Sequence, residues 1–245
     1  AQLEHLSIYL DSHFGDRAEP PPESLCSSGT FTDALGPALA ALANEVAAGS
    51  GPIVELGCSA GRGLWQLADA GASVLGVELR FAALRRARRI LAGEPLPYLR
   101  RRVARHYQEA VIQAPARPAA LVCGDALDPP LVPGSCGAVV ALNLLDSVAS
   151  TPRLLSVIDG LCRPGGQVLL ASPYAFQSSV VEEIGALDQP DPAAALRRLL
   201  LDGAGLSARY EILAEDERPW SLRRDARSLV HYQVHVLRAR KLGPG

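Results

Sequence analysis

Short apolar segments that alternate with helical segments constrain the fold of this chain most. Runs such as Ile53-Val54-Glu55-Leu56 and Gly137-Ala138-Val139-Val140-Ala141-Leu142 lack the period-two alternation of a half-exposed strand. Each run is followed by a segment with helical periodicity. This order is typical of parallel strands that helices cover on both faces. The sequence therefore predicts an α/β fold with a doubly wound, mostly parallel sheet.

The predicted elements fill most of the 245 residues. Strands are expected at 53–56, 73–78, 119–123, 137–142, 167–172, 210–214 and 230–237, which makes the sheet seven-stranded. Helices are expected at 32–48, 64–68, 81–91, 98–112, 153–161 and 192–201, so that 98–112 is a helical insertion after the second strand. We expect an N-terminal extension at 1–30, which ends in Glu19-Pro20-Pro21-Pro22, and a single domain at 31–245.

Composition excludes several classes of protein. The chain is 48% apolar with a net charge of -2, which argues against disorder. A pI near 6.2 argues against a general binder of nucleic acid or anionic membranes. No apolar run approaches the ~20 residues of a membrane helix. The five cysteines show no C-x-x-C spacing, so we expect no disulfide framework, no metal site and a cytoplasmic location.

A glycine-rich turn follows the first predicted strand. Gly57, Gly61 and Gly63 leave the backbone accessible, and the helix after them presents free N–H groups. Glu78 ends the second strand, 21 residues after Gly57, at the spacing where a carboxylate binds the ribose hydroxyls of a nucleoside. These features predict a nucleoside site at the carboxyl ends of the first strands.

An acidic residue before this turn bears on which nucleoside binds. Dinucleotide sites carry G-x-G-x-x-G, whereas this chain reads G-x-x-x-G-x-G. Glu55 lies within a strand that should be buried, and a buried carboxylate needs a partner. A cationic ligand would supply that partner, and a pyrophosphate would be repelled. A nicotinamide-dependent oxidoreductase, whose cofactor contains such a pyrophosphate, is the alternative function.

Five motifs together resemble those of class I S-adenosylmethionine-dependent methyltransferases. The first is Val54-Glu55-Leu56-Gly57-Cys58-Ser59-Ala60-Gly61, with Ser59 in place of the middle glycine of E/D-x-G-x-G-x-G. The others are Gly76-Val77-Glu78-Leu79, Cys123-Gly124-Asp125-Ala126, Asn143-Leu144-Leu145-Asp146 and Leu161-Cys162-Arg163-Pro164-Gly165-Gly166-Gln167-Val168-Leu169-Leu170. They occur in the order of that family and cover about residues 50–175.

The resemblance implies S-adenosyl-L-methionine as cofactor and the residues that bind it. These residues are Glu55, Gly57, Cys58, Ser59, Gly61, Glu78, Leu79, Asp125, Ala126 and Asn143. It also implies an in-line displacement that transfers the methyl group to a nitrogen or oxygen of a small molecule or peptide side chain. A non-catalytic, methyltransferase-like binding protein is a second alternative. No motif for planar amino groups follows the fourth strand, so nucleic-acid bases are a poor match.

Several residues are candidates for the acceptor side of the site. Asp146 is the catalytic candidate, to orient or deprotonate the acceptor; the alternatives are an N-cap for the helix from about Thr151 or a solvated loop acid. Candidates for acceptor contact are Tyr9, His13, Tyr174, Trp220 and Arg223.

The two ends of the chain supply most of these acceptor candidates. Tyr9 and His13 belong to an aromatic, turn-like segment that would form a lid. Family topology makes 217–224 the loop of a terminal hairpin on the active-site side, with Trp220 either contacting the acceptor or buried in the core. The tail weakly resembles small-molecule and peptidyl-histidine N-methyltransferases. His231 and His235 share a strand face and are expected to pack or be exposed rather than bind metal.

Arginines cluster between the second and third strands. Nine of the 24 basic residues fall within residues 80–105. Such a cluster can dock an acidic protein or RNA, or it can be a solvated helix face. The negative net charge and the scarcity of aromatic residues favour the solvated face.

Overall fold

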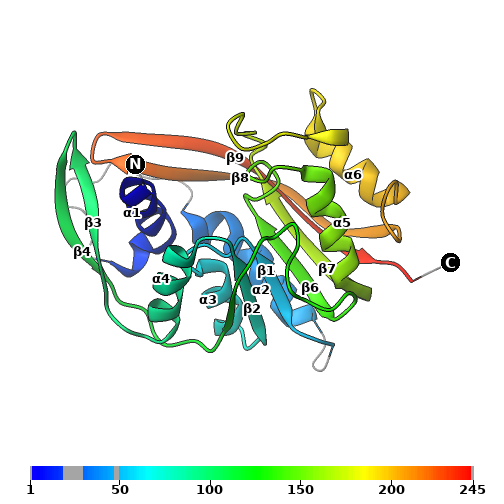
Figure 1. Ribbon diagram of the computed structural model, residues 1–245, viewed down its shortest axis with the longest axis horizontal. Helices are drawn as coiled ribbons and strands as arrows, with labels where there is room; N and C mark the ends of the chain where they lie inside the picture. The colour runs from blue at the N-terminus through cyan, green and yellow to red at the C-terminus, as the bar shows by residue number, and fades with distance from the viewer. Residues whose placement is uncertain (1, 19–29, 47–49, 244–245) are drawn as a thin grey trace.

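The computed structural model describes residues 2–18, 30–46 and 50–243. Its main sheet has seven strands in the order β5-β2-β1-β6-β7-β9-β8 (Figure 1). The strands are β1 (Ile53–Leu56), β2 (Val74–Glu78), β5 (Ala120–Cys123), β6 (Cys136–Leu142), β7 (Cys162–Ser172), β8 (Tyr210–Asp225) and β9 (Ser228–Lys241). Only β9 and its neighbours pair antiparallel in this sheet. The predicted doubly wound, mostly parallel sheet is confirmed.

Helices cover both faces of the sheet. One hydrophobic cluster joins the sheet to α2 (Phe31–Glu45), α3 (Arg62–Asp69) and α4 (Phe81–Leu91). A second cluster joins its other face to α5 (Thr151–Leu161) and α6 (Pro192–Asp202). The strand order reverses between β1 and β6, so the carboxyl ends of these two strands mark the switch point where ligands bind in such sheets.

Side-chain caps mark the starts of α2, α5 and α6. Thr30 and Asp33 form a capping box at the start of α2. Ser150 caps α5 by accepting from the backbone N–H of Arg153, and Asp191 caps α6 in the same way. The prediction that Asp146 could be the N-cap of α5 was wrong, because Ser150 fills that position.

The insertion after β2 is a β-hairpin, and the predicted helix at 98–112 was wrong. Its strands are β3 (Leu96–Val103) and β4 (His106–Ile112), which pair antiparallel. Tyr98 and Arg100 are buried, whereas Leu99 between them is exposed. This is the period-two alternation of a strand with one covered face. The run of arginines suggested a helix because arginine is a good helix former, but burial of alternate side chains determines the structure here.

The N-terminal segment is also more regular than predicted. Helix α1 (Gln2–Phe14) replaces the turn-like segment expected around Tyr9, and the short 3-10 helix η1 (Gly15–Arg17) follows it. Leu10 and Phe14, four residues apart on one face of α1, are buried in the core. In Figure 1, α1 lies between the β3–β4 hairpin and the β8–β9 ribbon. The proline-rich stretch 20–22 lies outside the described residues.

The terminal strands are far longer than predicted. Residues 217–224, expected to be a loop, belong to β8, and the turn comes only between Asp225 and Ser228. The β8–β9 ribbon thereby reaches over α1, and the backbone N–H of Ala226 donates to the carbonyl of Arg102 in β3 (Figure 1). A short 3-10 helix, η2 (Gly185–Leu187), precedes α6. None of the described helices has the length and apolarity needed to cross a membrane.

Candidate active site

Glu55 lies beneath the glycine turn at the switch point. Its side chain is 3% exposed, and burial raises its pKa to about 8, with Glu78 adding to the rise and the backbone N–H of Leu64 opposing it. Oε2 of Glu55 is buried with no hydrogen-bond partner among the described residues. A Cβ on Gly63 would lie 2.5 Å from Glu55 Oε1, so only glycine lets helix α3 begin over this carboxylate. A positively charged ligand group would satisfy the orphaned oxygen.

The turn and the end of β2 are joined through Glu78. Its carboxylate accepts from the backbone N–H of Ser59 at 3.0 Å and from that of Arg80 at 2.8 Å. Gly57 has a φ of +72°, and a Cβ there would lie 2.7 Å from Leu144. Cys58 contributes backbone to this turn, because its thiol is buried. Glu78 therefore holds the turn in place and keeps a half-buried carboxylate at the strand end.

The end of β5 supplies the third carboxylate. Asp125 is exposed and accepts from the backbone N–H of Leu127 at 2.8 Å. Ala126 beside it is buried. Leu79, which follows β2, is 66% exposed and presents an apolar surface at the same edge. Acidic groups beside an exposed apolar side chain suit a nucleoside base with an amino group.

Backbone strain concentrates at the same edge. Among the described residues other than glycine, four have positive φ, and three of them follow the carboxyl ends of strands: Ser59 after β1, Asn143 after β6 and Tyr174 after β7. The fourth, Ala104, forms the turn of the β3–β4 hairpin. Such conformations cost on the order of 1–3 kcal/mol each and cluster at functional sites. Oδ1 of Asn143 is also buried with no hydrogen-bond partner among the described residues.

Asp146 is buried between the ends of β6 and β7. It is 3% exposed, and its Oδ2 accepts from the backbone N–H of Ala175 at 2.9 Å. Burial raises its pKa, and hydrogen bonds from Ala175 and Ser147 oppose the rise. The negative charge of Asp146 helps to raise the pKa of Tyr9 in α1 and that of Tyr174 after β7. It is therefore not a solvated loop acid, because it fastens the segment after β7.

Two of the predicted acceptor residues lie on one face of α1. The rings of Tyr9 and His13 are 5.7 Å apart, and His13 lies 6.1 Å from the Trp220 ring. Trp220 is 4% exposed and stacks on Tyr232 at 5.6 Å, so the ribbon and α1 share an aromatic cluster. Burial, followed by the charge of Arg62, lowers the pKa of His13 to about 3, so this imidazole is neutral. Nδ1 of His13 and Nε1 of Trp220 are buried without hydrogen-bond partners among the described residues.

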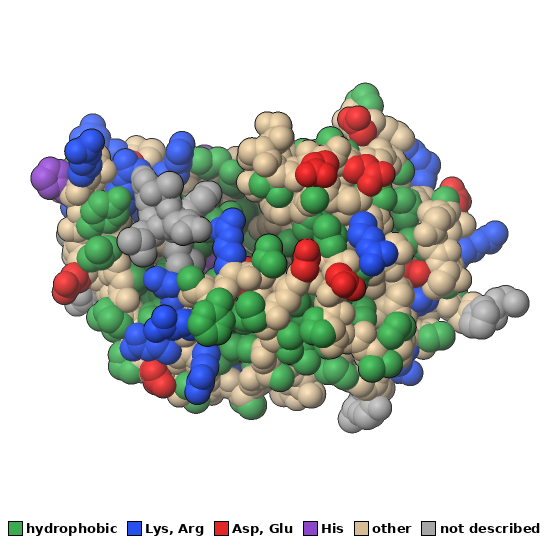
Figure 2. Space-filling view, in the orientation of Figure 1, with side chains coloured by type: hydrophobic (Ala, Val, Ile, Leu, Met, Phe, Trp, Pro, Cys, Tyr) green, Lys and Arg blue, Asp and Glu red, His purple; other side chains and the backbone are tan. Residues whose placement is uncertain are grey.

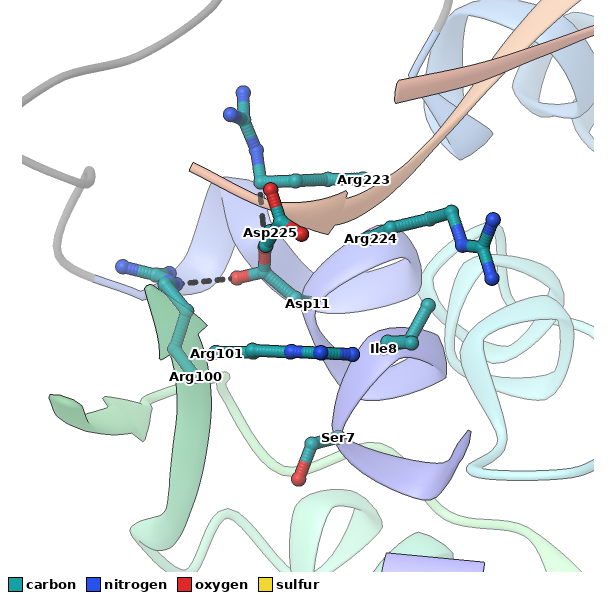
Figure 3. A pocket seen from close by; sticks show the side chains of 8 residues that line it. All are labelled: Ser7, Ile8, Asp11, Arg100, Arg101, Arg223, Arg224 and Asp225. Atoms are coloured by element: carbon teal, nitrogen blue, oxygen red, sulfur yellow. Dashed lines mark hydrogen bonds and ion pairs between the residues drawn. The ribbon is translucent and has the colours of Figure 1, made fainter. Parts of the chain in front are cut away.

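Arg223 faces a different side of α1. It lies 3.9 Å from Asp11, which is two residues from both Tyr9 and His13 and so on the opposite face of the helix. Asp11 also accepts from Arg100 at 2.6 Å. Figure 3 shows these residues around a small pocket with further lining residues Ser7, Ile8, Arg101, Arg224 and Asp225. Arg223 therefore lies beside Asp11, on the face of α1 opposite Tyr9 and His13.

The arginine cluster divides between two environments. Arg85, Arg88 and Arg89 of α4 are exposed, and basic side chains gather over α4 and the hairpin in Figure 2. Arg100, in contrast, is buried and forms an ion pair with Asp11. Figure 2 also shows a hollow beside α4, below the β8–β9 ribbon and above the carboxyl ends of the strands.

Comparisons with known proteins agree with this geometry. The methyltransferase domain family matches residues 54–170, which span β1 to β7. The chain therefore carries a methyltransferase domain, and its fold is that of class I S-adenosylmethionine-dependent methyltransferases. No curated protein sequence matches this methyltransferase.

Solved structures share its fold at low identity. Magnesium protoporphyrin IX methyltransferase from Synechocystis, with bound S-adenosylmethionine, is 15% identical with a TM-score of 0.52, over 97% of this chain and 96% of that one. A methyltransferase from Methanosarcina mazei is 18% identical with a TM-score of 0.54, over 82% and 97% of the chains. A putative RNA methyltransferase from Pyrococcus horikoshii is 12% identical with a TM-score of 0.57, over 98% and 99%.

Sequence reasoning missed two features of this methyltransferase. Arg62, directly after Gly61, is 1% exposed and makes a bidentate ion pair with Asp16 at 3.0 and 2.8 Å, which fastens the N-terminal segment to the glycine turn. A charged residue between Gly61 and Gly63 was the available signal. His235 was noted only for its spacing from His231, although it bonds to Tyr174. Within the described residues, no cluster of His, Cys, Asp and Glu could hold a metal ion.

Proposed function

We propose that this methyltransferase transfers a methyl group from S-adenosylmethionine to a nitrogen or oxygen of a small molecule or peptide side chain. The observation that carries the cofactor assignment is Glu55, whose buried and unpartnered Oε2 lies under a glycine turn. Glu78 and Asp125 end the two neighbouring strands at the same edge. Three acidic side chains suit a cationic nucleoside and oppose a pyrophosphate.

Each carboxylate has a distinct partner in this proposal. Glu55 would pair with the ammonium of the cofactor's amino-acid portion, Glu78 with its ribose hydroxyls, and Asp125 with its adenine amino group. Leu79 and Ala126 would contact the adenine, and the Gly57–Gly61 turn with Cys58 and Ser59 would contact the ligand through backbone. The bound cofactor supplies an electrophilic methyl group on a positively charged sulfur. The protein's part is then to hold the acceptor on the methyl axis, which can contribute roughly 7–11 kcal/mol.

The N-terminal extension at 1–30 is proposed to act as the lid over the acceptor. Tyr9 and His13 of α1, with Trp220 of β8, form an aromatic wall whose two buried N–H or N groups lack partners among the described residues. A planar or polar group of modest size suits such a wall better than a nucleic-acid duplex does.

The described cysteines 58, 123, 136 and 162 are all free thiols, which favours a reducing, cytoplasmic location.

The decisive test combines ligand binding with turnover. Calorimetry should show binding of S-adenosylhomocysteine and none of NADH; the reverse would support the oxidoreductase. Tritiated-methyl S-adenosylmethionine is then incubated with free amino acids, N-acetylated peptides, phenols and carboxylic acids. Labelled product identifies the acceptor class, whereas tight binding without product across the panel supports a non-catalytic binding protein.

Asp146 is proposed to orient the acceptor. Asp146→Asn keeps the size of the side chain but removes its charge, so turnover should fall at least about tenfold while S-adenosylhomocysteine affinity changes little. Kinetics with the acceptor from the panel and calorimetry measure the two effects. An equal loss of both would make Asp146 a structural residue that only holds the segment after β7.

A further inference from the structure

A chain of three polar side chains lies next to the proposed acceptor side, outside the cofactor-binding residues. Tyr174 Oη lies 2.7 Å from His235 Nδ1, and His235 Nε2 lies 3.1 Å from Glu215 Oε1. The three residues come from the segment after β7, from β9 and from β8. A carboxylate only accepts, so His235 donates through Nε2–H, and in the neutral imidazole Nδ1 then accepts from the Tyr174 hydroxyl.

The surroundings hold this chain in one geometry. His235 is 3% exposed, and the Tyr174 ring stacks on it at 5.9 Å with an interplanar angle of 26°. The backbone N–H of Tyr174 donates to Ser172 Oγ at 3.0 Å. Ser172 and His235 are register partners in the β7–β9 pair. The buried imidazole is therefore fixed by the sheet, and the tyrosine hydroxyl is fixed by the imidazole.

Tyr174 also lies at the edge where the reaction would occur. It follows the carboxyl end of β7 by two residues, and its φ of +53° is one of the strained values at that edge. The next residue, Ala175, is bonded to Asp146. The Tyr174 side chain is only partly buried, unlike His235. A hydroxyl that donates to His235 can still accept one more hydrogen bond, from an acceptor's N–H or O–H.

We propose that Tyr174 receives the proton of the methyl acceptor and passes its own to His235, with Glu215 positioning the imidazole. This inference rests on the proposed function. The acceptor atom forms its bond to the methyl carbon, and the carbon–sulfur bond breaks with its electron pair remaining on sulfur. The acceptor's proton moves to Tyr174 Oη, and the phenolic proton moves to His235 Nδ1. His235 ends as an imidazolium beside the Glu215 carboxylate.

The charges around Tyr174 explain why it needs a relay. Burial raises its pKa, and Glu217, Glu215, Asp191 and Asp146 raise it further. Tyr174 is therefore a neutral phenol at neutral pH, so no phenolate is present to act as the base. Glu215 also faces Arg197 of α6 at 3.5 Å, so its own negative charge is partly compensated. A proton accepted by Tyr174 can leave through His235, whose Nδ1 lies within hydrogen-bond distance of the hydroxyl.

Three variants of the full chain test the relay against a matched control. Tyr174→Phe removes only the hydroxyl, His235→Gln removes the proton acceptor, and Glu215→Gln removes its partner charge. His231→Gln is the control, because His231 lies on the same strand and bonds to Ser221 Oγ at 2.9 Å instead. The probes are S-adenosylhomocysteine for affinity and the acceptor identified by the labelling panel for turnover. Nitrogen-15 NMR of the histidine side chains reports the tautomer and protonation of His235 without any acceptor.

The relay predicts a specific pattern of results. Tyr174→Phe and His235→Gln should lower kcat about a hundredfold at neutral pH, with KM and S-adenosylhomocysteine affinity within about threefold of wild type. The deficit of His235→Gln should shrink at high pH, where the acceptor loses its proton unaided, and Glu215→Gln should show a smaller deficit of the same kind. A structural role would lower kcat evenly at all pH values.

Other results would overturn the relay and leave the proposed function intact. These are a kcat of Tyr174→Phe within threefold of wild type, a loss in His231→Gln as large as in His235→Gln, or an NMR spectrum with a proton on Nδ1 of His235 at neutral pH. If S-adenosylhomocysteine binds but no acceptor is methylated, the proposed function fails separately. The NMR comparison of wild type with Tyr174→Phe then decides the relay: an unchanged His235 Nδ1 signal rejects it, and a shift confined to His235 supports it.

Discussion

Glu55 carries a raised pKa of about 8 because burial disfavours its charge. Between its ordinary pKa of 4.5 and about 8, the folded protein holds a proton that the unfolded chain has lost. The contribution of Glu55 to stability is therefore fully present below pH 4.5 and is lost as pH rises through about 8. Glu55→Gln, which stays neutral, should be as stable as wild type near pH 4 and more stable near pH 9. Urea unfolding at both pH values measures this difference.

A matched variant separates this effect from a general change in charge. Glu109→Gln alters an exposed carboxylate of β4 and should leave the pH dependence of unfolding as in wild type. Glu55→Gln should also weaken S-adenosylhomocysteine binding, because a carboxyl group can give up its proton and pair with an ammonium, whereas an amide cannot. Parallel stability curves for Glu55→Gln and wild type would mean that this carboxyl titrates normally.

The other two carboxylates act on affinity. Glu78→Ala and Asp125→Ala should each weaken S-adenosylhomocysteine binding at least tenfold, about 1.4 kcal/mol, because each removes a charged hydrogen-bond acceptor. Asp128→Ala, an exposed acid in the turn that follows Asp125, is the control and should bind normally. Calorimetry on folded variants decides the matter, and wild-type affinity in both variants would place the nucleoside elsewhere.

At the scale of elements, local patterns and long-range contacts differ in how far the sequence reveals them. Strand β1 and helix α4 have the predicted bounds, because their apolar periodicity is complete within each segment. The β3–β4 hairpin was predicted wrongly because the buried Arg100 pairs with Asp11, which lies 89 positions away in the sequence. No local pattern announces such a partner.

The residues of the candidate site likewise differ in how far the sequence predicts them. The places of Glu55, Glu78 and Asp125 at the carboxyl edge of the sheet could be predicted, because each lies in or just after an apolar strand with family spacing. The bonds of His235 to Tyr174 and Glu215 could not, because they depend on the register of β7, β9 and β8. Position along the chain places a residue at a sheet edge, but only packing shows what its side chain touches.

Asp16 of η1, directly after α1, pairs with Arg62 beside the glycine turn, so a single change there should loosen the proposed lid. Asp16→Asn leaves the Arg62 guanidinium buried without its carboxylate, whose own side chain is 37% exposed. We expect a loss of stability of about 1–3 kcal/mol, smaller than for a fully buried pair, and faster amide hydrogen exchange in α1. Asp202→Asn, at the exposed end of α6, should change neither. Unchanged exchange in α1 would show that its apolar face alone holds the lid.

At the scale of the whole molecule, the β8–β9 ribbon links two distant parts. Its base packs against α5, and its tip contacts the β3–β4 hairpin beyond α1 (Figure 1). At the base, Lys241 Nζ lies 3.0 Å from Asp159 Oδ1, and the two side chains are each 6% exposed. Tyr210, at the start of β8, donates to the same carboxylate at 2.8 Å. This buried group fixes the ends of the ribbon to the domain.

Removing one member of this group should destabilise the entire chain. Burial alone would raise the pKa of Asp159, but hydrogen bonds from Ser207, Lys241 and Tyr210 outweigh it and lower that pKa. The resulting stability is present above pH 3.8 and is lost as pH falls through the lowered pKa. Lys241→Met leaves Asp159 buried without its cation, so we expect a loss of about 3–5 kcal/mol at neutral pH.

Acid and a second substitution identify the cause of that loss. Once Asp159 is protonated in acid, the difference between Lys241→Met and wild type should narrow, because no buried charge is then left alone. The double variant Asp159→Leu with Lys241→Met replaces the pair by apolar groups and should recover most of the stability at neutral pH. Thermal unfolding of the three proteins at two pH values measures both effects. If the double variant is no more stable than Lys241→Met, the aliphatic stem of Lys241 packs the ribbon and the ion pair contributes little.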